Sequence, residues 1–200
     1  MRIIELGIAD YKKIWKKMAE FTASRKKDTS DELWITEHNP IYTLGKNADE
    51  TNIIDKGEIP VLRVDRGGEV TYHGPGQIII YILIDLRRKG LSVSDLISMM
   101  EESIILLLKK YNVNARRMKK APGVYVGKMK IASIGIKVSK GCTYHGLSFN
   151  YDVDLKPFSG INTCGFKGLD VTSVKKLNIY ENKSSFIKKM IGILVDQLIN

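Results

Sequence analysis

The sequence has few of the residues that cross-link a chain or anchor it in a membrane. Two cysteines, Cys142 and Cys164, are too few for a disulfide scaffold and too far apart for a paired zinc-ligand motif. Three scattered histidines make a metal site unexpected. No apolar run reaches the roughly 20 residues that a membrane helix needs, and the first residues lack the apolar stretch of a signal peptide. We therefore expect a soluble cytoplasmic protein without a membrane partner.

The composition favours one folded unit. Hydrophobic residues make up 44% of the chain and charged residues 27%, a balance that argues against disorder. A chain of 200 residues is long enough to bury its own core without staples. Neither an internal repeat nor a linker rich in Pro, Gly or Ser divides it. We expect a single domain over residues 1–200.

Positive charge is in excess. The chain has 32 Lys and Arg against 22 Asp and Glu, which gives a formal net charge of +10. This excess favours an acidic partner, which is a nucleic acid, an anionic lipid or an acidic protein, but a lysine-rich solvated surface explains it equally well. A basic nucleic-acid-binding domain is the weaker alternative, because aromatic residues are not interleaved with the basic ones.

Hydrophobic periodicity predicts helices over 10–27, 92–111 and 184–198, the second of them with a capping box between Ser92 and Asp95. Strands are expected over 33–37, 41–44, 61–64, 77–86, 124–126, 131–138 and 143–151. The strand 77–86 is almost unbroken Ile and Leu, which is typical of a central strand covered on both faces. Strands and helices do not alternate regularly, so we expect an α+β fold with a mixed, largely antiparallel sheet flanked by helices.

A glycine-rich loop over 66–76 is the densest chemical feature. Its four glycines in eleven residues let a backbone approach a ligand closely. The segment matches neither the P-loop nor the Rossmann pattern. Arg66, Tyr72 and His73 lie together in it, a combination more typical of a binding loop than of a plain surface turn.

Lys130 stands out by strand parity. Side chains alternate along a strand, so Lys130 is expected to share a face with the apolar residues at the even positions that follow it. Those residues are Ala132, Ile134, Ile136 and Val138. A lysine at the end of an apolar face loses solvation unless an anion is near, although a lysine whose head reaches water is the common alternative.

Cys164 lies in an irregular, glycine-containing stretch, where a reactive thiol is more typical than a structural one. Cys142, at the start of a predicted strand, suits an inert role. A thiolate needs a positive neighbour, and Lys130, His73 and His145 are the candidates, so a Cys–Lys and a Cys–His pair both stay open. His38 is expected to order the turn before Pro40.

These segments resemble one known family. Residues 66–77 resemble the signature of the lipoyl(octanoyl) transferases, which are octanoyl-[acyl-carrier-protein]:protein N-octanoyltransferases. Residues 34–45, 130–135, 145–150 and 162–165 resemble further family segments in the same order, so the resemblance spans nearly the whole chain. Thr163 and Ile82 depart from the family pattern at positions where proline is frequent, and neither change removes a reacting group.

The resemblance implies a fold like that of biotin and lipoate protein ligases, with acyl transfer through a cysteine thioester. Carried over by position, Cys164 is the nucleophile and Lys130 is the acid/base group that favours the thiolate, with Lys128 as the ambiguous neighbour. No metal or cofactor is implied. The implied substrate-contact residues are Arg66, Gly67, Gly68, Glu69, Val70, Thr71, Tyr72, His73, Ser133, Ile134, Gly135, Gly146, Leu147 and Ser148.

The resemblance also implies partners. The donor is octanoyl-acyl carrier protein, and the acceptors are lipoyl domains of 2-oxo acid dehydrogenases and the glycine cleavage H protein. An acidic carrier protein suits the basic charge, and Arg66, Arg87 and Arg88 are expected near the mouth of the site. An ATP-dependent lipoate or biotin protein ligase on the same fold, which would not need Cys164, is the alternative.

Overall fold

The computed structural model describes residues 1–119 and 121–199. A seven-stranded mixed sheet has the order β1-β2-β6-β10-β9-β8-β7, and a three-stranded sheet has the order β4-β3-β5. Only the β1–β2 pair of the larger sheet is parallel. The strands are β1 (Arg2–Ala9), β2 (Glu32–His38), β3 (Ile41–Leu44), β4 (Val61–Arg63), β5 (Thr71–His73), β6 (Gln77–Leu83), β7 (Ala115–Arg117), β8 (Gly123–Val126), β9 (Met129–Ser139) and β10 (Cys142–Asn150).

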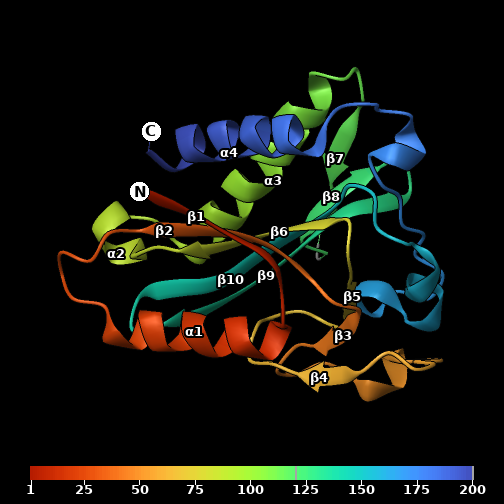
Figure 1. Cartoon of the computed structure of the whole chain (residues 1–200), viewed down its shortest axis with the longest axis horizontal. Coiled ribbons are helices and arrows are strands. Elements are labelled where there is room, and N and C mark those ends of the chain that lie inside the picture. The colour runs from red at the N-terminus through yellow and green to blue at the C-terminus, as the bar shows by residue number, and fades with distance from the viewer. Residues whose placement is uncertain (120, 200) are drawn as a thin grey trace.

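Helices cover both faces of the larger sheet (Figure 1). The main core lies between one face of the larger sheet and the apolar stripes of α3 (Val93–Lys109) and α4 (Lys183–Ile199). On the other face packs α1 (Tyr11–Ser24). The smaller sheet lies beside α1 and closes a third apolar cluster. Short helical segments are α2 (Leu86–Lys89), η1 (Glu50–Asn52), η2 (Lys156–Gly160), η3 (Thr163–Gly165) and η4 (Lys175–Leu177). None of the helices in the described ranges has the length and apolarity needed to cross a bilayer.

The α+β architecture expected from the sequence is confirmed. The three long helices are present, the capping box of Ser92 and Asp95 forms, and the central strand β6 is buried along its whole length. That strand ends at Leu83, before the expected residue 86, because Asp85 caps α2. The sequence patterns missed β1 and β7, and they treated 71–73 as irregular although these residues form β5.

The expected orientation of Lys130 is wrong, because β9 has a bulge. In the β8–β9 pair, Tyr125 faces Lys130 and Val124 faces Ala132, which leaves Ile131 as an extra residue. Cross-strand partners share a face, and consecutive residues of β8 do not. Lys130 therefore lies on the face of Tyr125, opposite Ala132. Residues 132, 134, 136 and 138 all face the main core, as predicted, because side chains alternate regularly from Ala132 onward.

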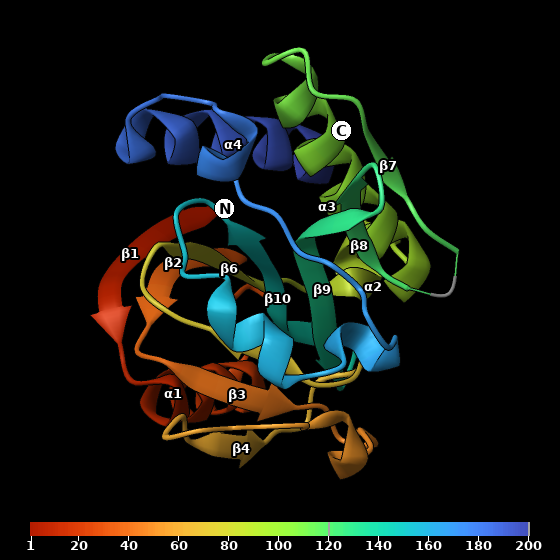
Figure 2. The same cartoon turned by 90° about the vertical axis from the view of Figure 1, so that its right-hand side faces the viewer.

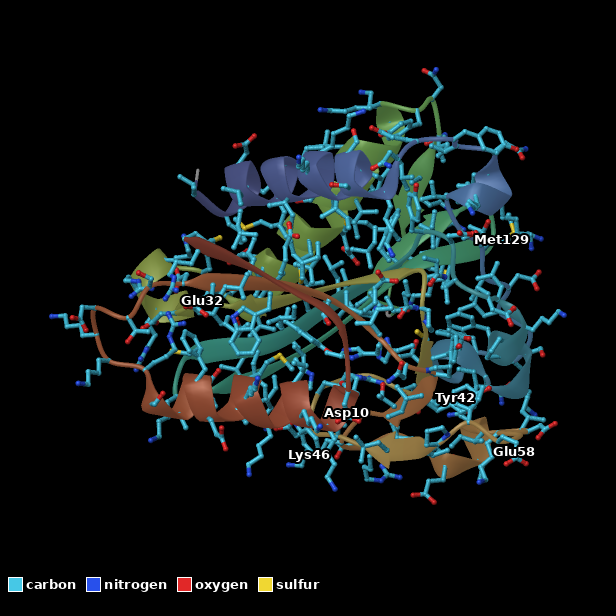
Figure 3. All side chains as sticks on the ribbon, viewed as in Figure 1. Asp10, Glu32, Tyr42, Lys46, Glu58 and Met129 are labelled. Atoms are coloured by element: carbon cyan, nitrogen blue, oxygen red, sulfur yellow. The ribbon has the colours of Figure 1, made fainter. Side chains whose placement is uncertain are left out.

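Lys130 is the second residue of β9 and lies at one end of the larger sheet. Figure 3 labels its neighbour Met129 at this end and Glu32 near the other end of the molecule. The glycine-rich loop, the smaller sheet and the segment 151–170 lie at the Met129 end, and Figure 2 shows that segment running in front of β9 and β10. Residues from distant parts of the sequence thus meet at one end of the sheet.

Candidate active site

The loop that carries Cys164 is fixed at both ends. An antiparallel bridge joins Ile161 to Ile53, and a parallel bridge joins Val171 to Lys130. In the second bridge the Lys130 N–H donates to Asp170 O at 2.8 Å. Between these anchors Cys164 adopts the left-handed conformation, with φ 57° and ψ 23°. Such a conformation is costly for a residue other than glycine, and it persists where surrounding contacts enforce it, often at functional sites.

The Cys164 thiol contacts the Lys130 ammonium. Nζ of Lys130 lies 2.7 Å from Sγ of Cys164, and it donates a second hydrogen bond to Pro122 O at 2.9 Å. Nζ also lies 5.2 Å from the centre of the Tyr125 ring. The Lys130 side chain is 1% exposed, whereas Lys128 is exposed in the β8–β9 turn. Of the two lysines, only Lys130 is placed to exchange a proton with the thiol.

Cys164 opens onto a cavity between the glycine-rich loop, β6, β9 and β10. Twelve of the residues implied by the resemblance line it, including all of 133–135 and 146–148. Gly67 and Tyr72 do not, and the Tyr72 ring packs instead against Tyr42 and Phe158. The residues on the cavity wall are Tyr11, Arg66, Gly68, Glu69, Val70, Thr71, His73, Ile79, Tyr81, Ser133, Ile134, Gly135, His145, Gly146, Leu147, Ser148 and Cys164.

Arg66 brings a buried positive charge to this cavity. Its guanidinium donates to Thr43 O at 2.6 Å, to Thr43 Oγ1 at 2.9 Å and to Gly67 O at 2.9 Å, all of them neutral acceptors. Arg66 is 7% exposed, and burial lowers its pKa. The ion pairs found within residues 1–119 and 121–199 do not include it. A buried cation without a carboxylate partner can stabilise negative charge that develops in the cavity.

His73 is engaged through both ring nitrogens. The Gln77 amide donates to Tyr72 O and to Asn150 Oδ1, so its Oε1 accepts from His73 Nδ1 at 2.7 Å. His73 Nε2 then accepts from the Thr43 hydroxyl at 3.2 Å. Burial lowers the pKa of His73 to about 3, so the ring is neutral at physiological pH. The structure thus does not pair His73 with Cys164.

His145 also lies on the cavity wall. Its Nε2 donates to Asp65 Oδ1 at 3.0 Å, and its Nδ1 lies 3.5 Å from the Tyr11 hydroxyl. Burial lowers the pKa of His145, although Asp65 partly opposes this. Asp65 also accepts from Trp15 Nε1 at 2.7 Å and from the Tyr144 hydroxyl. His145 therefore belongs to a buried polar network, and the thiol–lysine pair is the one that the structure forms.

Two tyrosines of the cavity wall were not expected there. Tyr11 lies in the apolar stripe of α1, and Tyr81 lies in the run of β6, so both patterns indicated ordinary core positions. The phenol of Tyr81 contacts His38 Nε2 at 2.6 Å, and the other nitrogen of His38 contacts Ala9 O. His38 thus connects the end of β1 to β6. A polar group on an otherwise apolar strand was the available sequence signal for Tyr81.

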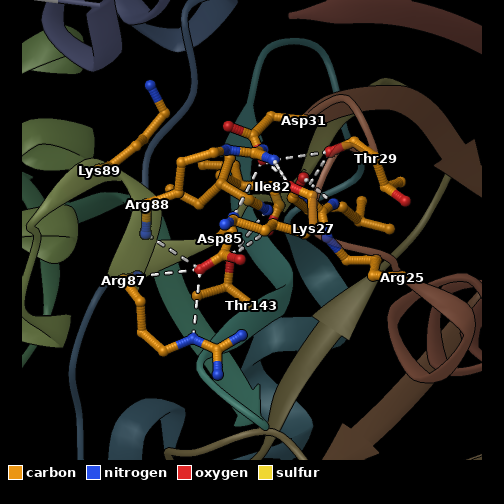
Figure 4. A network of polar contacts seen from close by, with 12 residues as sticks. Arg25, Lys27, Thr29, Asp31, Ile82, Asp85, Arg87, Arg88, Lys89 and Thr143 are labelled. Carbon is orange, nitrogen blue, oxygen red and sulfur yellow. Dashed lines mark hydrogen bonds and ion pairs between the residues drawn. The ribbon is translucent and has the colours of Figure 1, made fainter.

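Arg87 and Arg88, expected near the mouth, lie in α2 at the opposite end of the sheet (Figure 1), and Figure 4 shows the polar contacts around them. Arg88 and Arg25 both contact Oδ1 of Asp31, and Arg87 Nε lies 3.5 Å from Asp85 Oδ1. Cys142 begins β10 at this end and is buried, as expected of an inert cysteine. β10 has nine residues, and those on the cavity wall are 145–148, so roughly 10–20 Å of strand separates Cys142 at this end from the cavity. The expected location of the two arginines is therefore wrong.

The arrangement places a thiol beside a lysine amine at a cavity that also holds a buried cation. Within the described ranges, His, Cys, Asp and Glu side chains form no group of three that a metal ion would require. A thiol beside an ammonium is suited to covalent acyl transfer, in which the sulfur attacks and the amine exchanges protons. Apolar residues such as Ile79 and Leu147 on the wall suit an aliphatic chain.

Comparison with known proteins agrees with this chemistry. Residues 10–198 match the family model described as the lipoyl protein ligase A/B catalytic domain. The octanoyltransferase of Nitrosococcus oceani is 47% identical over 199 residues, covering 96% of this chain and 89% of the relative. The octanoyltransferase of Methylococcus capsulatus is 46% identical over 196 residues, covering 96% of this chain and 95% of the relative.

Solved structures show the same fold at low sequence identity. A lipoate-protein ligase A bound with ATP superposes with a TM-score of 0.81 at 15% identity, covering 99% of this chain and 85% of the other. The biotin protein ligase of Aquifex aeolicus superposes with a TM-score of 0.59 at 11% identity, covering 100% of this chain and 69% of the other. The ligase-like fold implied by the sequence is thereby confirmed.

Proposed function

The chain belongs to the lipoyl protein ligase A/B catalytic domain family and is an acyltransferase that transfers octanoyl groups in protein lipoylation, and on this premise we propose that Cys164 carries the octanoyl group as a thioester while Lys130 moves the protons. The observation that carries the proposal is the 2.7 Å contact between Lys130 Nζ and Cys164 Sγ at the cavity. The chain acts as one catalytic domain over residues 1–200.

In the first half-reaction the Cys164 thiolate attacks the carbonyl carbon of an octanoyl thioester. The donor is octanoyl-acyl carrier protein. The adjacent ammonium of Lys130 favours the thiolate and then gives a proton to the departing thiol of the donor. The Arg66 guanidinium, together with backbone N–H groups near Cys164 and in the glycine-rich loop, stabilises the oxyanion of the tetrahedral intermediate.

In the second half-reaction an acceptor lysine attacks the thioester on Cys164. Its amine must lose a proton, and Lys130, neutral after the first step, accepts it. The Cys164 sulfur leaves as the thiolate, and the product is an amide. The acceptors are lipoyl domains of 2-oxo acid dehydrogenases and the glycine cleavage H protein. The donor thioester is already activated, so the reaction needs no ATP.

Intact mass spectrometry tests this mechanism directly. We expect one octanoyl adduct after mixing the protein with octanoyl-acyl carrier protein, located on Cys164 by peptide mapping and lost on addition of a lipoyl domain. The proposal fails if no adduct forms while transfer proceeds, or if transfer requires ATP and releases AMP, as an ATP-dependent ligase would.

A further inference from the structure

Glu101 is an acidic residue inside the apolar face of α3. It is 6% exposed, and its neighbours on the same stripe, Met100 and Ile104, are fully buried in the main core. A buried carboxylate is costly unless hydrogen bonds or an opposite charge compensate it. Oε2 of Glu101 lies 3.5 Å from Arg117 Nε on the edge strand β7, and Oε1 accepts from the Gly123 N–H at 2.9 Å.

The Gly123 N–H belongs to the peptide group whose carbonyl is that of Pro122. This carbonyl is the acceptor for Lys130 Nζ, at 2.9 Å. A trans peptide is planar, with its N–H and C=O pointing in opposite directions, so fixing the N–H also fixes the carbonyl. A carboxylate on the N–H side further polarises the carbonyl and strengthens the hydrogen bond that it accepts.

The head of Lys130 depends on this carbonyl. The backbone of Lys130 is fixed by Asp170 and Thr172, but four flexible methylenes separate it from Nζ. Within residues 1–119 and 121–199, the other contacts of Nζ are the thiol and the Tyr125 ring. Pro122 O is thus the protein group that holds the ammonium beside Cys164, and Glu101 holds the peptide that carries Pro122 O.

We propose that Glu101 is a positioning residue, which places the Lys130 ammonium against Cys164 through the Pro122–Gly123 peptide group. This inference rests on the proposed roles of Lys130 and Cys164. Glu101 is not on the cavity wall, so its contribution lies in the reactivity of the thiol and not in binding of the acyl donor.

The test measures the rate at which iodoacetamide alkylates Cys164, in a Cys142→Ala background that leaves one thiol. Glu101→Leu removes the acceptor and should slow alkylation and octanoylation about tenfold, the effect of losing one hydrogen bond to a charged group. Glu101→Gln keeps an acceptor for Gly123 N–H and should stay within about threefold of the parent. The apparent KM for an octanoyl thioester should not change in either variant.

Glu102→Gln is the matched control. Glu102 is the next residue on α3, is half-exposed, and contacts Arg117 Nη2 at 2.6 Å without contacting Gly123. This variant should alkylate at the parent rate. Equal slowing in Glu101→Leu and Glu102→Gln, or a raised KM with an unchanged rate at saturation, would overturn the inference. Thermal unfolding of each variant confirms that the rates refer to folded protein. If Glu101→Leu does not fold, Glu101→Ala, which also lacks the acceptor for Gly123 N–H, takes its place with the same expected slowing.

A double-variant cycle decides whether Glu101 acts through Lys130. In a Lys130→Met background the substitution of Glu101 should have no further effect on alkylation, because the group that it positions is gone. Equal slowing in both backgrounds would show that Glu101 acts by another route. If Lys130→Met alone alkylated and transferred at the parent rate, the proposed role of Lys130 would be refuted instead, so the two failures are distinguishable.

Discussion

Gly123 leaves open the space through which the Lys130 side chain reaches Cys164. A Cβ at position 123 would lie 2.6 Å from Lys130 Cε and 3.0 Å from Nζ, and 2.3 Å from Ala132 O. Gly123 also has φ +136°, which side-chain-bearing residues rarely adopt. Both the backbone and the position of the lysine therefore require glycine here.

Gly123→Ala should displace the lysine and destabilise the fold. We expect octanoyl transfer to fall at least tenfold and the free energy of unfolding to fall by about 1–3 kcal/mol, from backbone strain and the clash with Ala132 O. Urea unfolding and a transfer assay check the two effects. Gly127→Ala is the control, since Gly127 has φ +59° in the neighbouring turn but a Cβ added there would meet no atom within 4 Å. Equal loss of transfer in both variants would contradict the prediction.

Substitution of the two cysteines should separate their roles. Cys164→Ala is expected to abolish octanoyl transfer while leaving the far-UV circular dichroism and the unfolding midpoint nearly unchanged, because the thiol is partly exposed at the cavity. Cys142→Ala, at a buried position remote from the cavity, should retain transfer. Normal turnover by Cys164→Ala together with an inactive Cys142→Ala would reverse the assignment.

Lys130→Ala should lower transfer by about 10² to 10⁴-fold, the usual contribution of a positioned acid–base group. It removes both the cation next to the thiol and the group that carries protons. Lys128→Ala should be nearly silent, because Lys128 is exposed in the turn. Single-turnover rates of each half-reaction provide the measurement, and an essential Lys128 with a dispensable Lys130 would contradict the structure-based choice.

Acid should destabilise the protein through its buried histidines. Burial lowers the pKa of His38 and His145, and it lowers that of His73 to about 3. Below pH 6.5 the unfolded histidines therefore bind protons before the folded ones, and stability falls as the pH falls toward 3. Each histidine contributes a slope of up to about 1.4 kcal/mol per pH unit.

Urea unfolding at pH 7.5, 6.0 and 5.0 measures this slope. His73→Gln keeps a polar side chain of similar reach but does not titrate, so its slope should be smaller than that of the parent protein. The same slope in both proteins would mean that His73 is not neutral in the folded state.

The remote arginine cluster should matter for stability and not for donor binding. Arg88→Gln removes a contact to the 8% exposed carboxylate of Asp31, so the free energy of unfolding should fall by about 1–2 kcal/mol. Lys26→Gln is the control, because Lys26 is an exposed cation on the loop that carries Asp31. This substitution should change the free energy of unfolding by less than about 0.5 kcal/mol.

Acylation by octanoyl-acyl carrier protein should slow with added salt, since charge steering between a basic enzyme and an acidic donor is screened. Arg88→Gln should show the same salt dependence as the parent, because Arg88 is remote from the cavity. A flattened salt dependence in Arg88→Gln would place the donor at the Arg88 end of the sheet.

Sequence patterns predicted the long helices and most strands, because each has a strong hydrophobic period. The edge strand β1 was not predicted, because several of its residues, such as Ile3 and Ile8, are exposed. Its hydrophobic pattern is therefore not that of a half-buried strand. The three residues of β5 were not predicted as a strand, because the glycines on both sides of them are typical of an irregular loop. Both omissions come from strands whose pairing depends on tertiary neighbours more than on local sequence.

For the site, the residues themselves singled out Lys130 and Cys164, and the family resemblance paired them. The strand-parity argument reached the right lysine through the wrong face, because an extra residue in β9 has no signature in a run such as Ile131-Ala132. The sequence also could not predict which histidine pairs with Cys164, if any, because the hydrogen bonds that engage His73 and His145 come largely from elements distant in sequence. The role of Glu101 was hidden because its acceptor contact is to a backbone N–H.

The bulge at Ile131 decides which face of β9 the Lys130 side chain occupies. A strand of the same length without the bulge would place Lys130 on the face of Ala132, in the main core, because residues two apart share a face. Every side chain named in the mechanism would still be present in such a protein, yet the sulfur would have lost its partner. Deleting Ile131 removes only the extra residue, so Tyr125 would still face Lys130 and Val124 would still face Ala132. A shorter β9 can therefore keep the lysine beside the sulfur, whereas a regular β9 of the present length cannot.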